Sequence, residues 1–358
     1  MAEVYRFDDP KVAALQNGIR QWWDVTEEKS IKAATLYLAQ GCPDWGERIG
    51  PPHNLCTFCA LPHAARAYRE EFFMGRPLLP AEHIGIFEAN LKHLAPATGD
   101  VHTLFVFNAG SFLAEQANPL AVQERVARLV AEHPTLRRLV IESRAGLITP
   151  TALDRLTSIL QSGGKSLTVR IGVETQDDHL RLKVLRKGHS RQELAAAVRM
   201  MRDRGVSSGG YALLNPAPGL DPSWAVQEAN RTIGWILKGL GMDEVYFGPT
   251  CVGPGTPLEA EWRAGRFQPA SLWAVLEVLS QVARRYNTRV HLLPFRDEPP
   301  FVAVSSNHVP EGIPETLEGA RGCDLAFHQM LQNYRETMNA TILDSPPVCS
   351  CRPDGLID

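Results

Sequence analysis

Three cysteines share one stretch rich in proline and glycine, "GCPDWGERIGPPHNLCTFC" (41–59). Cys42, Cys56 and Cys59 offer three thiolates, one fewer than a closed tetrahedral metal site needs. Such a set either takes a fourth ligand from elsewhere in the chain or leaves one coordination position open, as catalytic metal centres do. The stretch therefore predicts a metal site that has room for a further ligand.

Two kinds of metal fit these thiols. Three thiolates can hold three irons of a 4Fe-4S cluster and leave the fourth iron open. A C-x-x-C pair is equally common in zinc sites, where the fourth ligand here would be His53, His63 or a remote residue. The spacing alone favours neither metal.

A second group of cysteines lies near the end of the chain. Cys349 and Cys351 form a C-x-C pair, and Cys323 precedes them. These thiols fit a second iron–sulfur cluster with one iron free for substrate or sulfide, or a zinc site completed by His328. A C-x-C pair near a terminus also arises by accident, so unrelated surface cysteines are a third interpretation.

One further cysteine, Cys251, follows an apolar run in "GPTC" (248–251). A thiol at the end of a buried strand is first of all a core residue. If the strand end faces a cavity, Cys251 becomes a candidate catalytic thiol near the substrate, or a fourth cluster ligand.

Composition indicates a globular protein whose thiols serve metals. The chain has 358 residues, of which 44% are hydrophobic and 22% charged, and seven are cysteine. These cysteines are too few and too uneven for a disulfide framework. Lys and Arg number 37 against 40 Asp and Glu, so no overall field attracts polyanions. The sequence has neither a signal-peptide pattern nor an apolar run long enough for a membrane span, which predicts a cytoplasmic protein.

Short apolar runs alternate with amphipathic helical patterns along most of the chain, and this alternation must position the cysteines. The runs predict strands over 34–40, 103–110, 137–144, 167–175, 209–215, 243–249 and 288–294. Strands separated by helices form a parallel sheet, here a full or partial barrel with outer helices and its chemistry at the carboxyl ends of the strands. We expect an N-terminal helical extension (1–32), the barrel (33–294) and a C-terminal extension with an auxiliary metal site (295–358).

Several of these strand ends carry motifs that resemble the radical SAM superfamily. "CTFC" (56–59) is similar to the end of its cluster motif, although the first gap is longer than usual, as in the Elongator catalytic subunit. Further motifs occur in the order seen in the radical SAM subunit of archaeosine synthase, which acts on a modified guanine in tRNA. They are "FNAGSFL" (107–113), "VIESRAGLIT" (140–149), "GVETQDDHLRLKVLRKGHS" (172–190), "GYALLNPAPGL" (210–220) and the segment 248–279.

The resemblance implies an α/β fold, a partial (βα)6 TIM-like barrel, with a defined set of ligands. Cys42, Cys56 and Cys59 would hold a 4Fe-4S cluster, and S-adenosyl-L-methionine would chelate its free iron. The residues that would contact S-adenosyl-L-methionine are Phe58, Asn108, Gly110, Ser111, Glu142, Arg144, Glu174, Leu213 and Asn215. The relatives also have cysteines near the positions of Cys323, Cys349 and Cys351, which implies a probable second iron–sulfur cluster, with zinc as the alternative.

Ordinary structural roles compete with these assignments. Glu142 and Arg144 would form a salt bridge at a barrel rim, Glu174 would interact with a helix dipole, and Gly110 would be a turn glycine. Those alternatives stay open at the level of sequence.

The implied activity is reductive cleavage of S-adenosyl-L-methionine to a 5′-deoxyadenosyl radical that abstracts hydrogen from a substrate. A low-potential donor such as flavodoxin or ferredoxin is the expected partner. Our first expectation is a nucleoside or nucleotide-sized substrate, with sulfur insertion by the auxiliary cluster. A tRNA base-modifying enzyme is the alternative, and a non-catalytic iron–sulfur or zinc-binding protein is a third hypothesis.

Overall fold

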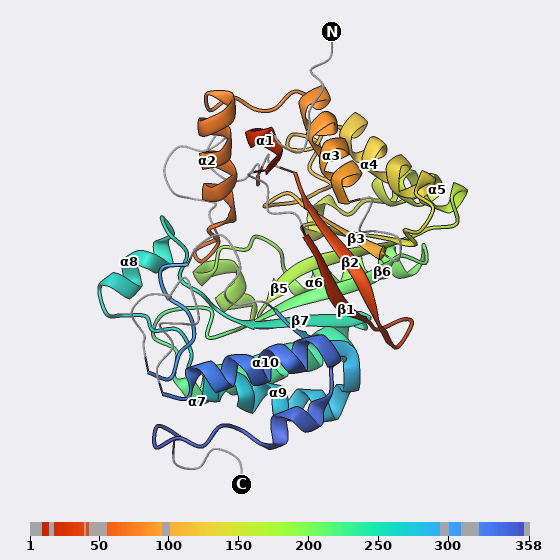
Figure 1. The fold of residues 1–358 in the computed structure, drawn as a ribbon. Helices are drawn as coiled ribbons and strands as arrows, with labels where there is room; N and C mark the ends of the chain where they lie inside the picture. The colour runs from red at the N-terminus through yellow and green to blue at the C-terminus, as the bar shows by residue number, and fades with distance from the viewer. Residues whose placement is uncertain are drawn as a thin grey trace.

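The computed structural model describes residues 9–13, 18–38, 41–42, 56–94, 101–293, 301–308 and 322–353. An eight-stranded sheet in sequential order curls into a partial barrel (Figure 1). β1 (Gly18–Asp24) pairs antiparallel with β2 (Lys29–Tyr37), and the remaining neighbours pair in parallel. The other strands are β3 (Val101–Phe107), β4 (Arg138–Glu142), β5 (Ser166–Glu174), β6 (Ser207–Leu214), β7 (Glu244–Pro249) and β8 (Val290–Leu292). The predicted fold class is confirmed.

Amphipathic helices cover the outside of the sheet (Figure 1). In α5, for example, Leu153, Leu156 and Leu160 recur at helical spacing and are buried, and the Thr149 side chain caps the first turn. The described helices are α1 (Pro10–Ala13), α2 (Leu61–Phe73), α3 (Pro80–Leu94), α4 (Leu120–Glu132), α5 (Pro150–Ser162), α6 (Arg191–Arg202), α7 (Pro222–Gly234), α8 (Pro257–Arg263), α9 (Leu272–Tyr286) and α10 (Asp324–Thr337).

Alternate residues of a strand pack into two different hydrophobic clusters. Leu104 and Val106 of β3 belong to the large cluster under the helices, whereas Phe105 between them belongs to a second cluster inside the barrel. This follows from the period of two in a strand, whose successive side chains point to opposite faces. The inner cluster also contains Trp22 and Tyr246, so the barrel interior is lined by aromatic rings.

The N-terminal region differs from the helical extension predicted for residues 1–32. Besides the four-residue α1, its described part contains β1 and the start of β2. Asp24 shapes the hairpin, because its carboxylate accepts bonds from the backbone N–H groups of Thr26 (2.8 Å) and Glu27 (3.0 Å) and pairs with Arg138 (2.8 Å). The segment is a strand because Trp22 and Asp24 alternate into the protein, a period that a helix cannot satisfy.

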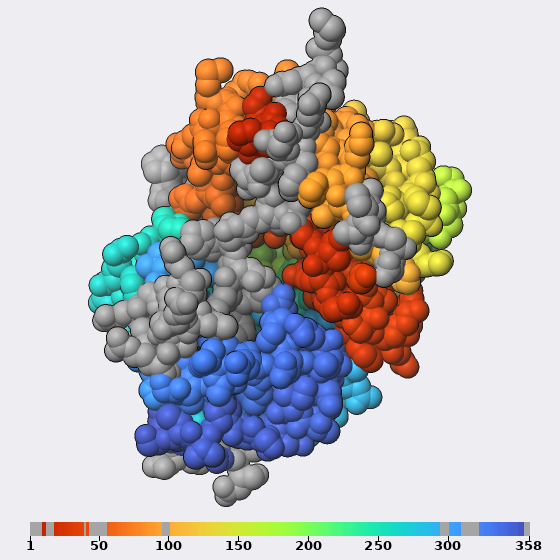
Figure 2. Space-filling model, in the orientation of Figure 1, coloured from red at the N-terminus to blue at the C-terminus, as the bar shows by residue number. Residues whose placement is uncertain are grey.

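The C-terminal region contains a long helix, α10. α10 packs against both edge strands, β1 and β8, and the Tyr334 hydroxyl donates to the Val290 carbonyl at 2.9 Å. Figure 2 shows the C-terminal residues, in blue, beside the N-terminal strands, in red. Among the described residues, no helix is long and apolar enough to cross a membrane.

Candidate active site and metal centre

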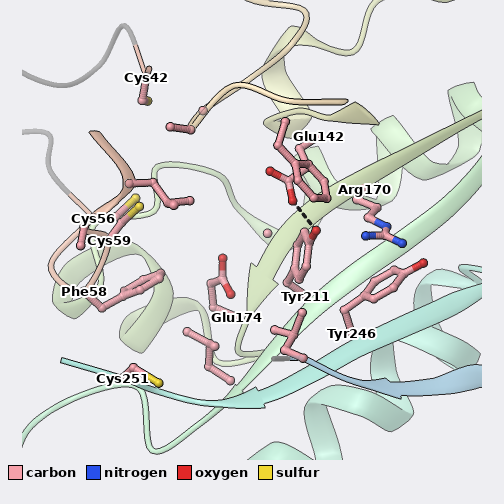
Figure 3. A pocket seen from close by; sticks show the side chains of 18 of the residues that line it. Cys42, Cys56, Phe58, Cys59, Glu142, Arg170, Glu174, Tyr211, Tyr246 and Cys251 are labelled. Carbon is pink, nitrogen blue, oxygen red and sulfur yellow. Dashed lines mark hydrogen bonds between the residues drawn. The ribbon is translucent and has the colours of Figure 1, made fainter. Parts of the chain in front are cut away.

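A cavity of about 380 Å³ opens at the carboxyl ends of the strands (Figure 3). It lies where parallel α/β barrels place their chemistry. Cys42, Cys56 and Cys59 line one end, and the buried aromatic interior of the barrel lines the other. Of the other residues predicted from the sequence, the cavity is lined by Phe58, Gly110, Ser111, Glu142, Arg144, Glu174, Leu213 and Cys251.

Gly110 determines how closely the chain can approach Cys42. After β2 the backbone continues beside the end of β3, where the Leu38 N–H donates to the Phe107 carbonyl at 2.6 Å. A Cβ atom on Gly110 would lie 2.6 Å from Cys42 Cα and 2.9 Å from its backbone nitrogen. No Cβ tolerates such a contact with backbone, so Cys42 can occupy its position only if residue 110 is glycine.

Cys56 and Cys59 lie in the turn that leads into α2. The Cys59 N–H donates to the Cys56 carbonyl at 3.3 Å, and the Thr57 N–H donates to the Leu185 carbonyl at 3.2 Å. Burial, and then the neighbouring Cys56, raise the pKa of the Cys59 thiol to about 12. Thiols in such a setting ionise when a metal compensates their charge.

The loop thiols do not form a compact ligand set for a single ion among the described residues. Among the described residues, one group of Cys, His, Asp or Glu side chains has all its ligand atoms within 4.8 Å of one another. That group contains none of Cys42, Cys56 and Cys59. Thiolates that bind separate irons of a cluster stand further apart than ligands of a single ion. His53 falls outside the described residues, and His63 Nε2 lies 3.0 Å from the Gly255 carbonyl oxygen instead. The donor set and the glycine beside Cys42 thus fit a 4Fe-4S cluster.

The end of β4 brings Glu142 and Arg144 to the cavity. Burial raises the pKa of the Glu142 carboxyl, which accepts a hydrogen bond from the Tyr211 hydroxyl (Figure 3). Arg144 donates from its side chain to the Lys187 carbonyl at 2.8 Å and from its backbone N–H to Ser111 Oγ at 3.1 Å. The two residues do not form the mutual salt bridge considered from the sequence, because each has a different partner.

Glu174 ends β5 in the left-handed backbone region, with φ of 65°. Its carboxylate lies 2.5 Å from Lys187 Nζ, and only 4% of the residue is exposed. Burial lowers the pKa of Lys187, but the Glu174 carboxylate together with Cys56 and Cys59 raises it overall. A non-glycine residue in this conformation is a feature of functional sites, where surrounding contacts hold it.

Trp22, Arg170 and Tyr246 line the floor of the cavity and pack on further buried residues, none of which the sequence singled out. The Arg170 guanidinium lies 3.6 Å from the centroid of the Tyr246 ring and 4.4 Å from that of Phe105. Trp22 stacks on His291 with centroids 4.6 Å apart, and His291 pairs with Glu244 at 3.0 Å. These residues come from five strands and share no sequence motif. In the sequence, the signal that could have indicated them is the alternation of strand residues between the barrel interior and its outside.

Two predicted residues lie elsewhere. Asn108 is buried beside the cavity and donates to the Ser111 carbonyl at 3.2 Å, so it shapes the loop around Gly110. Asn215 has φ of 52° and donates to the Gln268 carbonyl at 2.8 Å, so its side chain is engaged away from the lining. Both residues directly follow a strand, as expected, but the geometry of the local turn determines where their side chains point. Cys251 does line the cavity, and burial raises the pKa of its thiol to about 12.

The three C-terminal cysteines converge, but with a different histidine from the one expected. Their sulfur atoms and an imidazole nitrogen of His308 all lie within 4.8 Å of one another. His328 lies in α10, four residues beyond its first residue Asp324, and is not part of this group. His308 escaped notice because it lies 15 residues before Cys323, outside any C-x-x-C or H-x-H spacing. We call these four residues the Cys3His group.

No protein-family profile matches the chain. It is 25% identical over 247 residues to archaeosine synthase subunit beta of Methanosarcina acetivorans, covering 69% of this chain and 66% of that protein. It is 27% identical over 186 residues to the protein of the same name from Thermococcus kodakarensis, covering 52% of this chain and 56% of that one. The chain thus spans between about half and two thirds of the length of its curated relatives. The resemblance predicted from the motifs is confirmed.

Solved structures of similar fold include Elp3 of Methanocaldococcus infernus, at 16% identity and a TM-score of 0.49, covering 70% of this chain and 57% of that one. Another is the radical S-adenosylmethionine methyltransferase TsrM from Kitasatospora setae, at 15% identity and a TM-score of 0.40, covering 65% of this chain and 37% of that one.

Proposed function

Because the chain is similar to archaeosine synthase subunit beta and its motifs resemble those of the radical SAM superfamily, we propose that it is a radical SAM enzyme that modifies a nucleobase. The observation that carries the proposal is one cavity with three thiols at its mouth and a buried cationic and aromatic floor. The thiols would bind the cluster, the rim would bind S-adenosyl-L-methionine, and the floor would bind the substrate.

Cys42, Cys56 and Cys59 would hold the 4Fe-4S cluster. When bound, the cluster and S-adenosyl-L-methionine supply reductive cleavage of a carbon–sulfur bond, which starts radical chemistry. The chain itself supplies position and exclusion of water. Phe58, between two of the thiols, contributes an apolar ring to the lining.

The rim offers groups of both charges to a zwitterionic amino acid. The Glu142 carboxyl suits an ammonium group, and the paired Glu174 and Lys187 offer an acceptor and a donor a short distance away. Charge-assisted hydrogen bonds of this kind are short and strong. Ser111 and Leu213 line the same wall and would fix the rest of the cofactor.

The floor suits a planar heterocycle with acceptor atoms at one edge. Aromatic rings provide stacking surfaces, and a guanidinium can donate to two acceptors of a purine edge at once. The Nε atom of Arg170 is buried and has no hydrogen-bond partner in the described part of the chain. A buried donor without a partner is costly, and a bound ligand would remove this cost.

We favour a base within tRNA over a free nucleoside, because the motif resemblance implies a tRNA substrate and the curated relatives are named archaeosine synthase subunit beta. Sulfur insertion would need an auxiliary cluster with an open iron, and the compact Cys3His group offers one histidine and three thiols to a single ion. Base modification without sulfur insertion therefore fits the residues better. An electron donor of the flavodoxin or ferredoxin type remains part of the proposal.

The test is the formation of 5′-deoxyadenosine after anaerobic reconstitution with iron and sulfide. We expect tRNA from a strain that lacks this protein to stimulate the reaction, and wild-type tRNA and free nucleosides to do so far less. Stimulation by free nucleosides alone would replace the tRNA substrate by a small one. No 5′-deoxyadenosine under any condition, with the cluster present, would favour the non-catalytic hypothesis.

A further inference from the structure

The region beyond the barrel contains a compact group of possible metal ligands, separate from the cavity thiols. We propose that the Cys3His group binds a single zinc-type divalent ion in a closed tetrahedral site, and that this ion holds one wall of the active cavity. The proposal does not depend on the function proposed above, since it concerns a different set of residues.

The distances between ligand atoms match one ion. His308 Nε2 lies 3.3 Å from Cys349 Sγ and 3.4 Å from Cys323 Sγ, and Cys323 Sγ lies 3.5 Å from Cys351 Sγ. In a tetrahedral site with zinc–sulfur bonds of about 2.3 Å, neighbouring ligand atoms stand about 3.8 Å apart. Small outward shifts of these side chains therefore suffice to seat the ion. A cubane, whose thiolates bind separate irons, would need them to spread much further.

N–H donors of neighbouring residues face two of the cysteine sulfur atoms. The Trp273 indole N–H lies 3.3 Å from Cys351 Sγ, and the Asn307 side-chain amide lies 3.4 Å from Cys323 Sγ. Three thiolates and a divalent ion leave one negative charge, which such N–H donors stabilise. Outer partners of this type orient the ligands and tune a metal site.

Hydrogen bonds within the protein also hold His308 in place independently of a metal. The Asp324 carboxylate accepts from Ser306 Oγ at 2.6 Å and from the Asn307 backbone N–H at 2.9 Å. These bonds attach the segment 301–308 to the first turn of α10, immediately after Cys323. The ligand His308 is thereby held beside the thiols by contacts that do not involve the metal.

An ion at this point would connect the tail to the wall of the cavity. Residues 349–351 come from the tail, Cys323 precedes α10, and His308 lies within residues 301–308. That segment pairs with Val252, whose N–H donates to the Ala303 carbonyl at 2.8 Å. Phe301 of the segment and Cys251 next to Val252 both line the cavity. The metal would thus stabilise a cavity wall without touching the substrate, since four protein ligands leave no open position.

The experiment is metal analysis of anaerobically reconstituted wild type and of matched variants. We expect about one zinc per chain besides the cluster iron, lost in His308→Ala and retained in the control His328→Ala. Iron content should be the same in all three proteins. Cobalt substitution should give visible thiolate-to-cobalt absorption in the wild type, and none in His308→Ala.

Several outcomes would overturn the proposal: loss of about four irons in His308→Ala, unchanged zinc in that variant, no zinc in the wild type, or a Cys323–Cys351 disulfide in the reduced, intact protein. If His308→Ala fails to fold, zinc release from wild type during thiol titration replaces it, with one ion expected per three thiols modified. Production of 5′-deoxyadenosine, measured alongside, separates failure of this site from failure of the proposed enzyme.

Discussion

The Glu174 carboxylate and the Lys187 ammonium lie 2.5 Å apart inside the cavity, joined across the chain segment that follows β5. The side chains are only 5% and 16% exposed, respectively. Removing one partner of a buried pair leaves the other charge without compensation. The pair therefore serves both the fold and the rim that would receive the cofactor.

Lys187→Met should lower the free energy of unfolding by about 3 kcal/mol, because Glu174 keeps a buried charge. The double variant Lys187→Met with Glu174→Gln should recover part of this loss, since neither charge remains. Urea denaturation measures both effects. Glu70→Gln is the matched control: its partner Arg66 and Glu70 itself are 63% and 55% exposed, so less than about 1 kcal/mol is expected. An equal change in the free energy of unfolding at both pairs would show that burial does not increase the contribution of the cavity pair.

Gly110→Ala should remove the cluster while leaving the fold intact. The added Cβ would meet the Cys42 backbone at 2.6 Å, so Cys42 must move away from its place. Iron content after anaerobic reconstitution and 5′-deoxyadenosine formation should both fall. In the control Gly146→Ala the new Cβ meets nothing within 4 Å, and both quantities should stay at the wild-type level. A full complement of iron in Gly110→Ala would contradict the placement of Cys42.

Glu142 should make stability depend on pH in a defined direction. Burial raises the pKa of its carboxyl in the folded protein, so the folded state retains the proton where the unfolded chain, with a pKa of about 4.3, has lost it. Stability of the wild type therefore falls as pH rises from the unfolded pKa through the folded one. Glu142→Gln removes this titration and keeps an acceptor for Tyr211.

The stability of Glu142→Gln relative to wild type should consequently increase over that pH window, as measured by urea denaturation at each pH. Tyr211→Phe should steepen the dependence, because the lost hydroxyl donates to the carboxylate and lowers its pKa. A constant difference between Glu142→Gln and wild type across the window would exclude the raised pKa.

Arg170→Lys should weaken stimulation by tRNA about tenfold, the effect of losing one good two-point contact to a base edge. Lysine retains the positive charge but lacks the planar fork and the stacking on Tyr246. Binding of S-adenosyl-L-methionine, followed by equilibrium dialysis, should not change. If cofactor binding falls while tRNA stimulation persists, Arg170 belongs to the cofactor site instead.

The sequence predicted the parallel strands and their ends well, because each strand is a short apolar run bounded by polar turns. It failed at β1, where Trp22 and Trp23 resemble a helical pair but alternate between two faces of the sheet. Lys187 reaches Glu174 from 13 residues away through an irregular turn, and such a contact has no periodic signal. His308 joins the cysteines because the segment 301–308 contacts the first turn of α10, which is a tertiary outcome.

α10 also restricts the route by which a macromolecule can reach the cavity. A partial barrel has a lateral seam between its first and last strands, and α10 packs against both β1 and β8 (Figure 1). In the described part of the chain the seam is covered, and the cavity lies at the carboxyl ends of the strands. A folded RNA is much wider than a cavity of about 380 Å³, so its target base would have to leave the stack and enter alone, as enzymes that act on single bases require.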